Sequence, residues 1–141
     1  MNVKRLTDSA KLPKKAHTGD LGYDLFSDEE VLILPGQSEL IPTGIAVEFP
    51  EGYGGIIKDR SSVASKLGLV TAAGVIDNGY VGEIRILLIN TSGQMVVLKK
   101  GEKIAQLVLV QTVDFDVTEV YYDLESADER GTGGFGSTGT T

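Results

Sequence analysis

Short runs of β-branched and other apolar residues recur along the chain, and turns that contain Gly or Pro separate them. This spacing is typical of an all-β sandwich or barrel, and the apolar repeat of an α-helix is nearly absent. The exception is residues 61–67, which favour one short helix that a Ser caps at its first turn and that ends at Gly68. The predicted strands comprise residues 31–34, 45–49, 53–59, 69–73, 83–90, 94–98, 104–110 and 117–121.

The strongest local turn signal is the pair Asn78-Gly79. Both residue types tolerate a positive φ, which a type I′ turn requires at its two central positions. We therefore expect a tight hairpin that joins residues 69–77 to residues 80–90.

The composition changes near the carboxyl end. With 141 residues the chain has the size of one domain and is too short to divide comfortably into two. From residue 131 on it is rich in Gly and Thr, with Phe135 as its one large apolar side chain. Such a tail cannot bury enough surface to offset the entropy of ordering it. We predict a β domain at residues 1–124 and a flexible arm at residues 125–141.

Charge and composition narrow the possible chemistry. A net charge of −7, from 20 acidic and 13 basic side chains, argues against stable binding to long nucleic acids. The absence of Cys excludes disulfides, thiolate metal sites and a thiol nucleophile. The sequence contains no run of 18 apolar residues, and no apolar segment follows the basic amino end, so we expect a cytoplasmic protein without membrane contact. A small polyanionic ligand would need a divalent cation, a few Arg residues and backbone N–H groups.

Two segments in the first half combine Gly or hydroxyl residues with charge. Residues 18–25 place Asp24 beside glycines, although a surface turn that leads into a strand is the simpler interpretation. In Asp59-Arg60-Ser61-Ser62 a strand meets the predicted helix. The free N–H groups of a helix start, two hydroxyls and a guanidinium together suit a phosphate. A capped helix start with a solvated Arg remains an equal alternative.

A third candidate surrounds the predicted hairpin turn, at residues 74–82. An Asp before Asn-Gly is usually a turn residue, and this interpretation is sufficient for Asp77 taken alone. The functional interpretation is that Asp77 orients and deprotonates a water molecule while the Tyr80 ring forms a pocket wall.

The last two candidates are Gln106 and the tail. Gln106 is the lone polar residue in an apolar strand, and period-2 alternation alone would explain it as an outward-facing residue. In the tail, Arg130 could meet a phosphate and Phe135 could stack on a base. The composition of the tail is equally that of a disordered linker.

Taken in order and with their spacings, these five segments resemble the motifs of the trimeric dUTPase family, from about Thr18 to the end of the chain. The most discriminating pieces are residues 74–77 with Tyr80 and Gly82, and residues 130–139. The resemblance implies a distorted jelly-roll fold and an enzyme that hydrolyses dUTP to dUMP and pyrophosphate with Mg²⁺. Such an enzyme limits uracil incorporation into DNA and supplies dUMP for dTMP synthesis. The resemblance also implies a homotrimer, in which the arm of one subunit closes an active site of its neighbours.

The same resemblance assigns roles to individual residues. Asp77 would activate the water, with Arg60 and Ser61 as its catalytic partners at the phosphates, and Tyr80 would exclude a 2′-hydroxyl. Asp24 would contact the Mg²⁺ shell indirectly, through water. The backbone near Gly74 would select uracil. The remaining substrate-binding positions implied are Ser62, Gly74, Val75, Ile76, Gln106, Arg130, Gly134, Phe135, Gly136, Ser137 and Thr138.

Some positions depart from the family pattern. Asp59 stands where many members have Gly or Pro, and its charge lies close to the expected phosphate site. Ser62 stands where many members have Gly. Lys103 replaces the more usual Arg, which removes a bidentate donor.

Two alternatives remain open. A dCTP deaminase shares the fold and an Arg-Ser-Ser segment, but it uses a Glu in the hairpin region where this chain has Asp77-Asn78-Gly79-Tyr80. A module that senses dUTP without turnover would need a broken catalytic position. Asp77, Arg60, Ser61 and Arg130 are all present in this chain.

Overall fold

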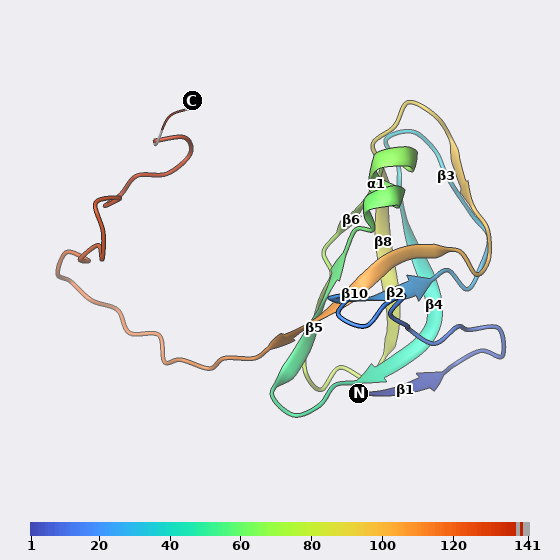
Figure 1. Cartoon of the computed structure of the whole chain (residues 1–141), viewed down its shortest axis with the longest axis horizontal. Coiled ribbons are helices and arrows are strands. Elements are labelled where there is room, and N and C mark those ends of the chain that lie inside the picture. Colours follow the sequence, from blue (N-terminus) through green and yellow to red (C-terminus); the bar gives the residue numbers. More distant parts are fainter. Residues whose placement is uncertain (138, 140–141) are drawn as a thin grey trace.

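The computed structural model describes residues 1–137 and 139, and these form an all-β body followed by a long extended tail (Figure 1). Three antiparallel sheets hold the strands, in the orders β1-β4-β8-β6, β2-β10-β5-β7 and β3-β9. The all-β prediction is confirmed. The strands are β1 (Asn2–Arg5), β2 (Gly22–Phe26), β3 (Val31–Ile33), β4 (Ser38–Glu48), β5 (Tyr53–Lys58), β6 (Leu69–Ala72), β7 (Val75–Ile76), β8 (Glu83–Asn90), β9 (Val96–Leu98) and β10 (Lys103–Gln111), and the described helix is α1 (Ser61–Leu67).

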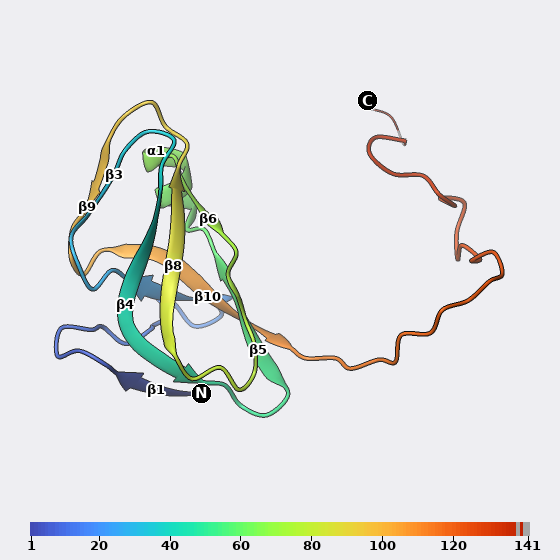
Figure 2. The same cartoon turned by 180° about the vertical axis from the view of Figure 1, so that it is seen from behind.

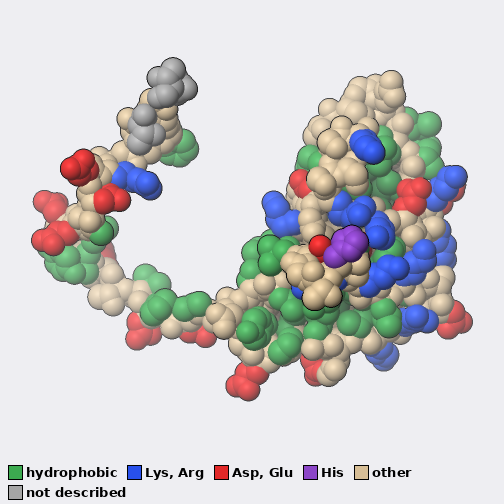
Figure 3. All heavy atoms as spheres, in the orientation of Figure 1, with side chains coloured by type: hydrophobic (Ala, Val, Ile, Leu, Met, Phe, Trp, Pro, Cys, Tyr) green, Lys and Arg blue, Asp and Glu red, His purple; other side chains and the backbone are tan. Residues whose placement is uncertain are grey.

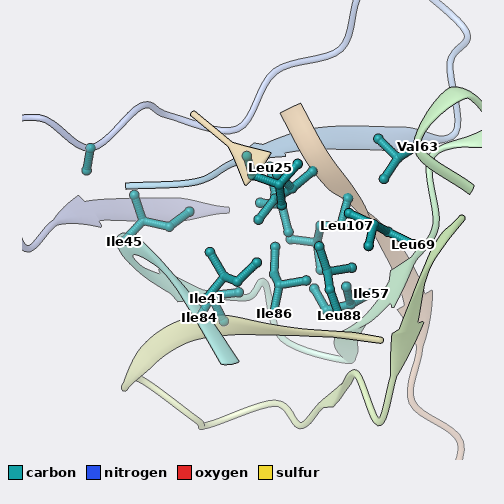
Figure 4. Close-up of a cluster of buried hydrophobic side chains, with 14 of the residues drawn as sticks. Leu25, Ile41, Ile45, Ile57, Val63, Leu69, Ile84, Ile86, Leu88 and Leu107 are labelled. Carbon is teal, nitrogen blue, oxygen red and sulfur yellow. The ribbon is translucent and has the colours of Figure 1, made fainter. Parts of the chain in front are cut away.

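The hydrophobic core lies between the two four-stranded sheets (Figure 4). Strand β8 turns every second side chain toward this core. Ile84, Ile86 and Leu88 are buried, while Arg85 is exposed. Alternation of this kind follows from side chains that point to opposite faces of a strand. Burying one Leu or Ile side chain contributes about 1.5–3 kcal/mol. The largest fully buried side chains are Leu25, Ile33, Ile41, Ile45, Leu69, Ile84, Ile86, Leu88, Leu98, Ile104, Leu107 and Val47.

Strand β4 is longer than predicted, because it continues through turn-forming residues. It pairs with β8 from Ser38 to Ala46, with an irregularity between Pro42 and Ala46. Gly44 lies in this bulge with φ 66°, and a Cβ there would come 2.7 Å from the Asp28 carboxylate. A bulge tolerates both a missing N–H and a positive φ, so residues that signal a turn here lie inside a strand.

Other strand predictions were incomplete or wrong. Strand β1 was not predicted, and β7 was placed in one arm of the hairpin. Strand β2 was considered only as a strand after a surface turn; it begins at Gly22, where a Cβ would overlap the Gln106 side chain. Residues 117–121 were predicted as a strand but form none, and the Val117 side chain is fully exposed at 100%. A strand requires a hydrogen-bonded neighbour, and the described chain offers this segment no partner.

The predicted hairpin was wrong in its geometry. A turn does form, with the Tyr80 N–H donating to the Asp77 carbonyl at 3.2 Å, but only Gly79 of the central pair has a positive φ, 93°. That is the pattern of a type II turn and not of type I′. The preceding segment, β7, pairs with β5, while β6 pairs with β8. The turn therefore lies between β7 of one four-stranded sheet and β8 of the other, and it does not join two paired strands.

The short helix was predicted at the correct residues, and its end at Gly68 is confirmed. Gly68 has φ 65°, and its N–H donates to the carbonyls of Ala64 and Val63. The predicted Ser cap was wrong, because the N-cap residue is Arg60 and no side chain caps the first turn.

After β10 the chain leaves the sheets, and Figures 1 and 2 both show residues 112–137 running away from the body. The segment after β10 lacks strands and helices as far as it is described. The proposed division at residue 124 stays a prediction. No helix in the described part of the chain is long and apolar enough to cross a membrane.

Candidate active site

The start of α1 faces strands β2 and β10 across a hollow of about 240 Å³. It brings together five of the residues that the sequence assigns to phosphates and metal, although they come from three separate segments of the chain. The hollow is lined by Ala16, Asp20, Leu21, Gly22, Asp24, Arg60, Ser61, Ser62 and Gln106.

The donors in this hollow are held at the helix start. The N–H groups at the start of a helix have no partner within it, and no side chain caps them in α1. The first carbonyl, that of Arg60, accepts the N–H groups of Val63 and Ala64 at 3.0 Å each. The hydroxyls of Ser61 and Ser62 are exposed. This end of α1 therefore offers donors and a positive potential to an anion.

Asp24 is the buried acid of the hollow, with 8% of its surface exposed. Its Oδ1 lies 2.8 Å from Arg60 Nε and its Oδ2 lies 2.7 Å from Lys103 Nζ. Burial alone would raise the pKa of Asp24. The hydrogen bond from Lys103 and the charges of Arg60 and Lys103 outweigh burial and lower the pKa below its ordinary value of 3.8. Asp24 is therefore ionised at neutral pH, and it orients the guanidinium that lines the hollow.

Gln106 reaches the hollow from β10. Its Nε2 donates to the Asp59 carbonyl at 2.7 Å, and its side chain lies over Gly22 of the neighbouring strand. Only Gly leaves room there, since a Cβ at residue 22 would meet the Gln106 amide. The missing Cβ of Gly22 is thus what leaves space for the Gln106 side chain in the hollow.

A second hollow, of about 310 Å³, lies beside the turn at residues 77–80. It brings together four residues that the sequence assigns to the nucleoside and the attacking water. Gly74 precedes them with φ 95°, and its carbonyl accepts the Ile57 N–H at 2.8 Å. The lining residues are Leu40, Val75, Ile76, Asp77, Tyr80, Glu83 and Arg85.

Hydrogen bonds that the sequence gave no reason to expect fix the turn in place. Asn78 Nδ2 donates to the Pro50 carbonyl at 3.0 Å and to the Tyr53 carbonyl at 2.7 Å. The Tyr80 hydroxyl donates to the Glu83 carbonyl at 2.9 Å, and the ring lies over Gly82, where a Cβ would come 2.5 Å from the phenol oxygen. Asp77 and Tyr80 are exposed side chains on a rigid support.

The predicted residues of the tail lie close to one another but in neither hollow. Asp128, Glu129, Arg130, Gly133 and Ser137 line a separate depression. Phe135, between Gly134 and Gly136, is fully exposed with φ 48°. Acidic side chains cluster along the tail, as Figure 3 shows. Thr138 lies outside the described residues.

Within one chain the candidate residues therefore form three groups. The hollow beside α1, the hollow beside the turn and the depression in the tail share no lining residue. The residues that the sequence assigns to a single nucleoside triphosphate are thus divided among these three places.

Comparison with known proteins identifies the family. The dUTPase family model matches residues 8–139. A Clostridium kluyveri protein, deoxyuridine 5'-triphosphate nucleotidohydrolase, is 48% identical over 141 residues, which cover 98% of this chain and 96% of the relative. The chain belongs to the dUTPase family, as its ordered motifs predicted.

Solved structures agree in fold. The Staphylococcus bacteriophage 80alpha dUTPase with dUPNHPP has a TM-score of 0.90 and 36% identity, with 99% of this chain and 98% of that chain covered. A dUTPase from phage phi11 of S. aureus, in which a structural Mg(II) ion is coordinated, has a TM-score of 0.81 and 32% identity, with 89% and 98% covered. The jelly-roll prediction is thereby confirmed.

Proposed function

We propose that this protein is a dUTP diphosphatase, which hydrolyses dUTP to dUMP and pyrophosphate. The observation that carries the proposal is the hollow beside α1, where Arg60, Ser61 and Ser62 at the helix start converge with Gln106, although α1 and β10 are far apart in sequence. Membership of the dUTPase family supports the same substrate.

In this proposal the residues of the hollow position the triphosphate and neutralise its charge. The guanidinium of Arg60, the hydroxyl of Ser61, the backbone N–H of Ser62 and the amide of Gln106 supply donors to phosphate oxygens. Phosphoryl transfer requires alignment and charge stabilisation more than covalent participation by the protein. Because Asp24 holds Arg60 by its Nε, the guanidinium is oriented before the substrate arrives.

Asp77 takes the proton of the attacking water. As the water oxygen bonds to the α-phosphorus, the bond from this phosphorus to the α–β bridging oxygen breaks, and pyrophosphate leaves with the electron pair. A base fixed on a turn supports this step, because Asn78 ties that turn to the loop before β5 through two hydrogen bonds. Tyr80 lies against the sugar and leaves no space for a 2′-hydroxyl.

The residues present fit a magnesium ion that arrives with the substrate. In the part of the chain that the structure describes, no three His, Asp or Glu side chains are placed to hold a metal. Both oxygens of Asp24 already contact cationic side chains, so Asp24 would contact the ion's shell only through water. The triphosphate and water would supply the other oxygen ligands, and the ion would neutralise phosphate charge.

Removing Mg²⁺ with a chelator is expected to abolish most dUTP turnover and to leave the melting temperature unchanged, because in this proposal the metal arrives with the substrate and takes no part in the fold. The measurement pairs an assay of pyrophosphate release with thermal denaturation of the same sample. Re-addition of Mg²⁺ is the control. A large drop in melting temperature on chelation would place the metal in the fold instead.

We propose a homotrimer with active sites shared between subunits, and the separation of the three groups within one chain supports it. The outward face of the β4-β8-β6 sheet supports such an assembly, since its paired positions Leu40↔Leu87 and Val70↔Ile89 are apolar and Leu40 is 52% exposed. An apolar sheet face of this kind is normally covered by a neighbour. In the proposed trimer the arm of one subunit closes a site formed by the others.

Replacing Tyr80 with Ala is expected to raise hydrolysis of UTP relative to dUTP, because discrimination rests on steric exclusion of one hydroxyl. Tyr80→Phe is the matched control, since it keeps the ring and loses only the hydrogen bond to the Glu83 carbonyl. The ratio of kcat/KM for the two nucleotides measures the effect. An unchanged ratio in Tyr80→Ala would move the sugar selection to other residues.

The function itself is tested by incubating the protein with Mg²⁺ and, separately, each dNTP and UTP, and identifying the products. The proposal expects dUMP and pyrophosphate from dUTP alone. Ammonia released from dCTP would indicate a deaminase, and binding of dUTP without product would indicate a sensing module.

A further inference from the structure

The side chain of Asp59 contacts β6 and does not line the phosphate hollow. Its Oδ1 accepts the Thr71 N–H at 2.6 Å and also the Thr71 hydroxyl. Asp59 directly follows β5, whereas Thr71 lies in β6 of the other four-stranded sheet. The pair therefore joins the two sheets and closes the segment between them, which consists of α1 and its flanking residues.

The backbone of Asp59 is held as well. Its carbonyl accepts Gln106 Nε2 at 2.7 Å, and Gln106 belongs to β10. The next residue, Arg60, is fixed through its Nε by Asp24 of β2. Contacts from three strands thus converge on the two residues that precede α1. None of them is local in sequence.

We propose that Asp59 is a positioning residue for phosphate binding. By its contact with Thr71 it holds the peptide that leads into Arg60, Ser61 and Ser62, and so fixes where these donors meet the triphosphate. The inference rests on the proposed function. In this role the carboxylate of Asp59 acts as a hydrogen-bond acceptor. The sequence suggested that its negative charge would oppose the phosphates, but the carboxylate points to β6 instead.

Small displacements of positioning groups have large effects, since an error of about 1 Å can cost about 10²-fold in rate. Asp59→Ala removes the acceptor and is expected to lower kcat/KM for dUTP by between about 10-fold and 10²-fold. Asp59→Asn keeps an oxygen for both donors of Thr71 and is expected to stay within about threefold of the parent. Thr71→Val keeps the N–H and loses the hydroxyl. Its kcat/KM should lie between those of Asp59→Ala and Asp59→Asn.

The matched control is Thr91→Val. The Thr91 hydroxyl donates to the Gly68 carbonyl at 2.7 Å, at the opposite end of α1. Its loss likewise removes one Thr hydroxyl hydrogen bond to a residue that flanks α1, but at the end away from the phosphate hollow. We expect a melting temperature similar to that of Thr71→Val and a parental kcat/KM.

The test measures melting temperature, kcat, KM, and the binding of two probes by calorimetry. Pyrophosphate reports on the phosphate hollow and deoxyuridine on the other hollow. The inference expects Asp59→Ala and Thr71→Val to weaken pyrophosphate binding and to leave deoxyuridine binding unchanged. If Asp59→Ala fails to fold, Thr71→Val carries the comparison. Parental pyrophosphate binding in Thr71→Val, an Asn variant as impaired as Ala, or equal losses in Thr91→Val would each overturn it.

The two proposals fail separately. A parent protein that binds pyrophosphate but leaves dUTP intact contradicts the diphosphatase function, while the effect of Asp59 on pyrophosphate binding still tests the positioning role. A parent protein that hydrolyses dUTP and loses nothing in Asp59→Ala keeps the function and loses the inference.

Discussion

Asp77→Asn is expected to lower the rate of dUTP turnover by roughly 10² to 10⁴, the usual contribution of a positioned general base. The substitution keeps the shape of the side chain and one accepting oxygen, and it removes the negative charge and the basicity. The turn itself should persist, because Asn78 and the Tyr80 hydroxyl hold it through carbonyls of other residues. Single-turnover kinetics with dUTP and Mg²⁺ measure the chemical step directly.

Binding of dUPNHPP supplies the control for this prediction. Its affinity should change far less than the rate, because the phosphates contact Arg60, Ser61 and Gln106 in the proposed mechanism. If Asp77 only forms the turn, Asn should serve nearly as well, since both residue types favour turns. A variant within about threefold of the parent rate, less than about 1 kcal/mol, would remove Asp77 from the mechanism.

Such a result would leave the identity of the general base open. The structure argues against the residue that would be considered next. Sequence reasoning points next to Asp24. The contacts with Lys103 and Arg60 lower its pKa and occupy both of its oxygens, so it is a poor acceptor for a proton from water. Asp24 is better suited to orient Arg60 than to act as a base.

The sequence predicted those elements that local signals determine. Strand β8 was predicted at its observed bounds, because a run rich in Ile and Leu lies between Gly82 and the turn at Ser92-Gly93. The end of α1 was predicted because Gly68 adopts the left-handed conformation that a helix end favours. Strand β4 was cut short because Pro42 and Gly44 signal a turn, and only its pairing with β8 shows that they form a bulge.

The order of the motifs predicted which residues belong to the candidate site. It did not predict which residues they contact. Asp59 illustrates the difference, since its position beside Arg60 suggested a charge facing phosphates, yet its carboxylate contacts Thr71. Asn78 was seen only as a turn residue, because its partners Pro50 and Tyr53 are far away in sequence. Long-range hydrogen bonds of this kind leave no periodic pattern from which they could be predicted.

The failed strand at residues 117–121 has a related cause. This segment is rich in β-branched residues and ends in Tyr121, a composition that strands favour. In the chain the side chains of Val117 and Tyr121 are exposed, at 100% and 90%. The residue types of a segment show what it could bury in a sheet. A strand forms only where the edge of a sheet is available to pair with it.

Deleting residues 130–141 is expected to reduce dUTP turnover by about 10²-fold or more, because the removed arm would no longer orient the phosphates or exclude water. The melting temperature should hardly change. In the described part of the arm the N–H groups of Arg130 and Gly131 donate to nearby residues, Asp128 and Ser126, and Phe135 is fully exposed, so this part adds nothing to the core. Phe135→Ala should reproduce part of the loss. Full activity in the truncated protein would make the arm a linker.

Mixing two inactive chains tests whether the arm acts on a neighbour. The truncated chain keeps Asp77 and lacks the arm, whereas the Asp77→Asn chain keeps the arm and lacks the base. If a site takes Asp77 and the arm from different subunits, co-refolding the two in equal amounts restores activity. Random assembly then completes about a quarter of the sites, because each of the two parts is intact with a probability of one half. If every chain closes its own site, the mixture stays as inactive as its components, and the shared-site proposal is wrong.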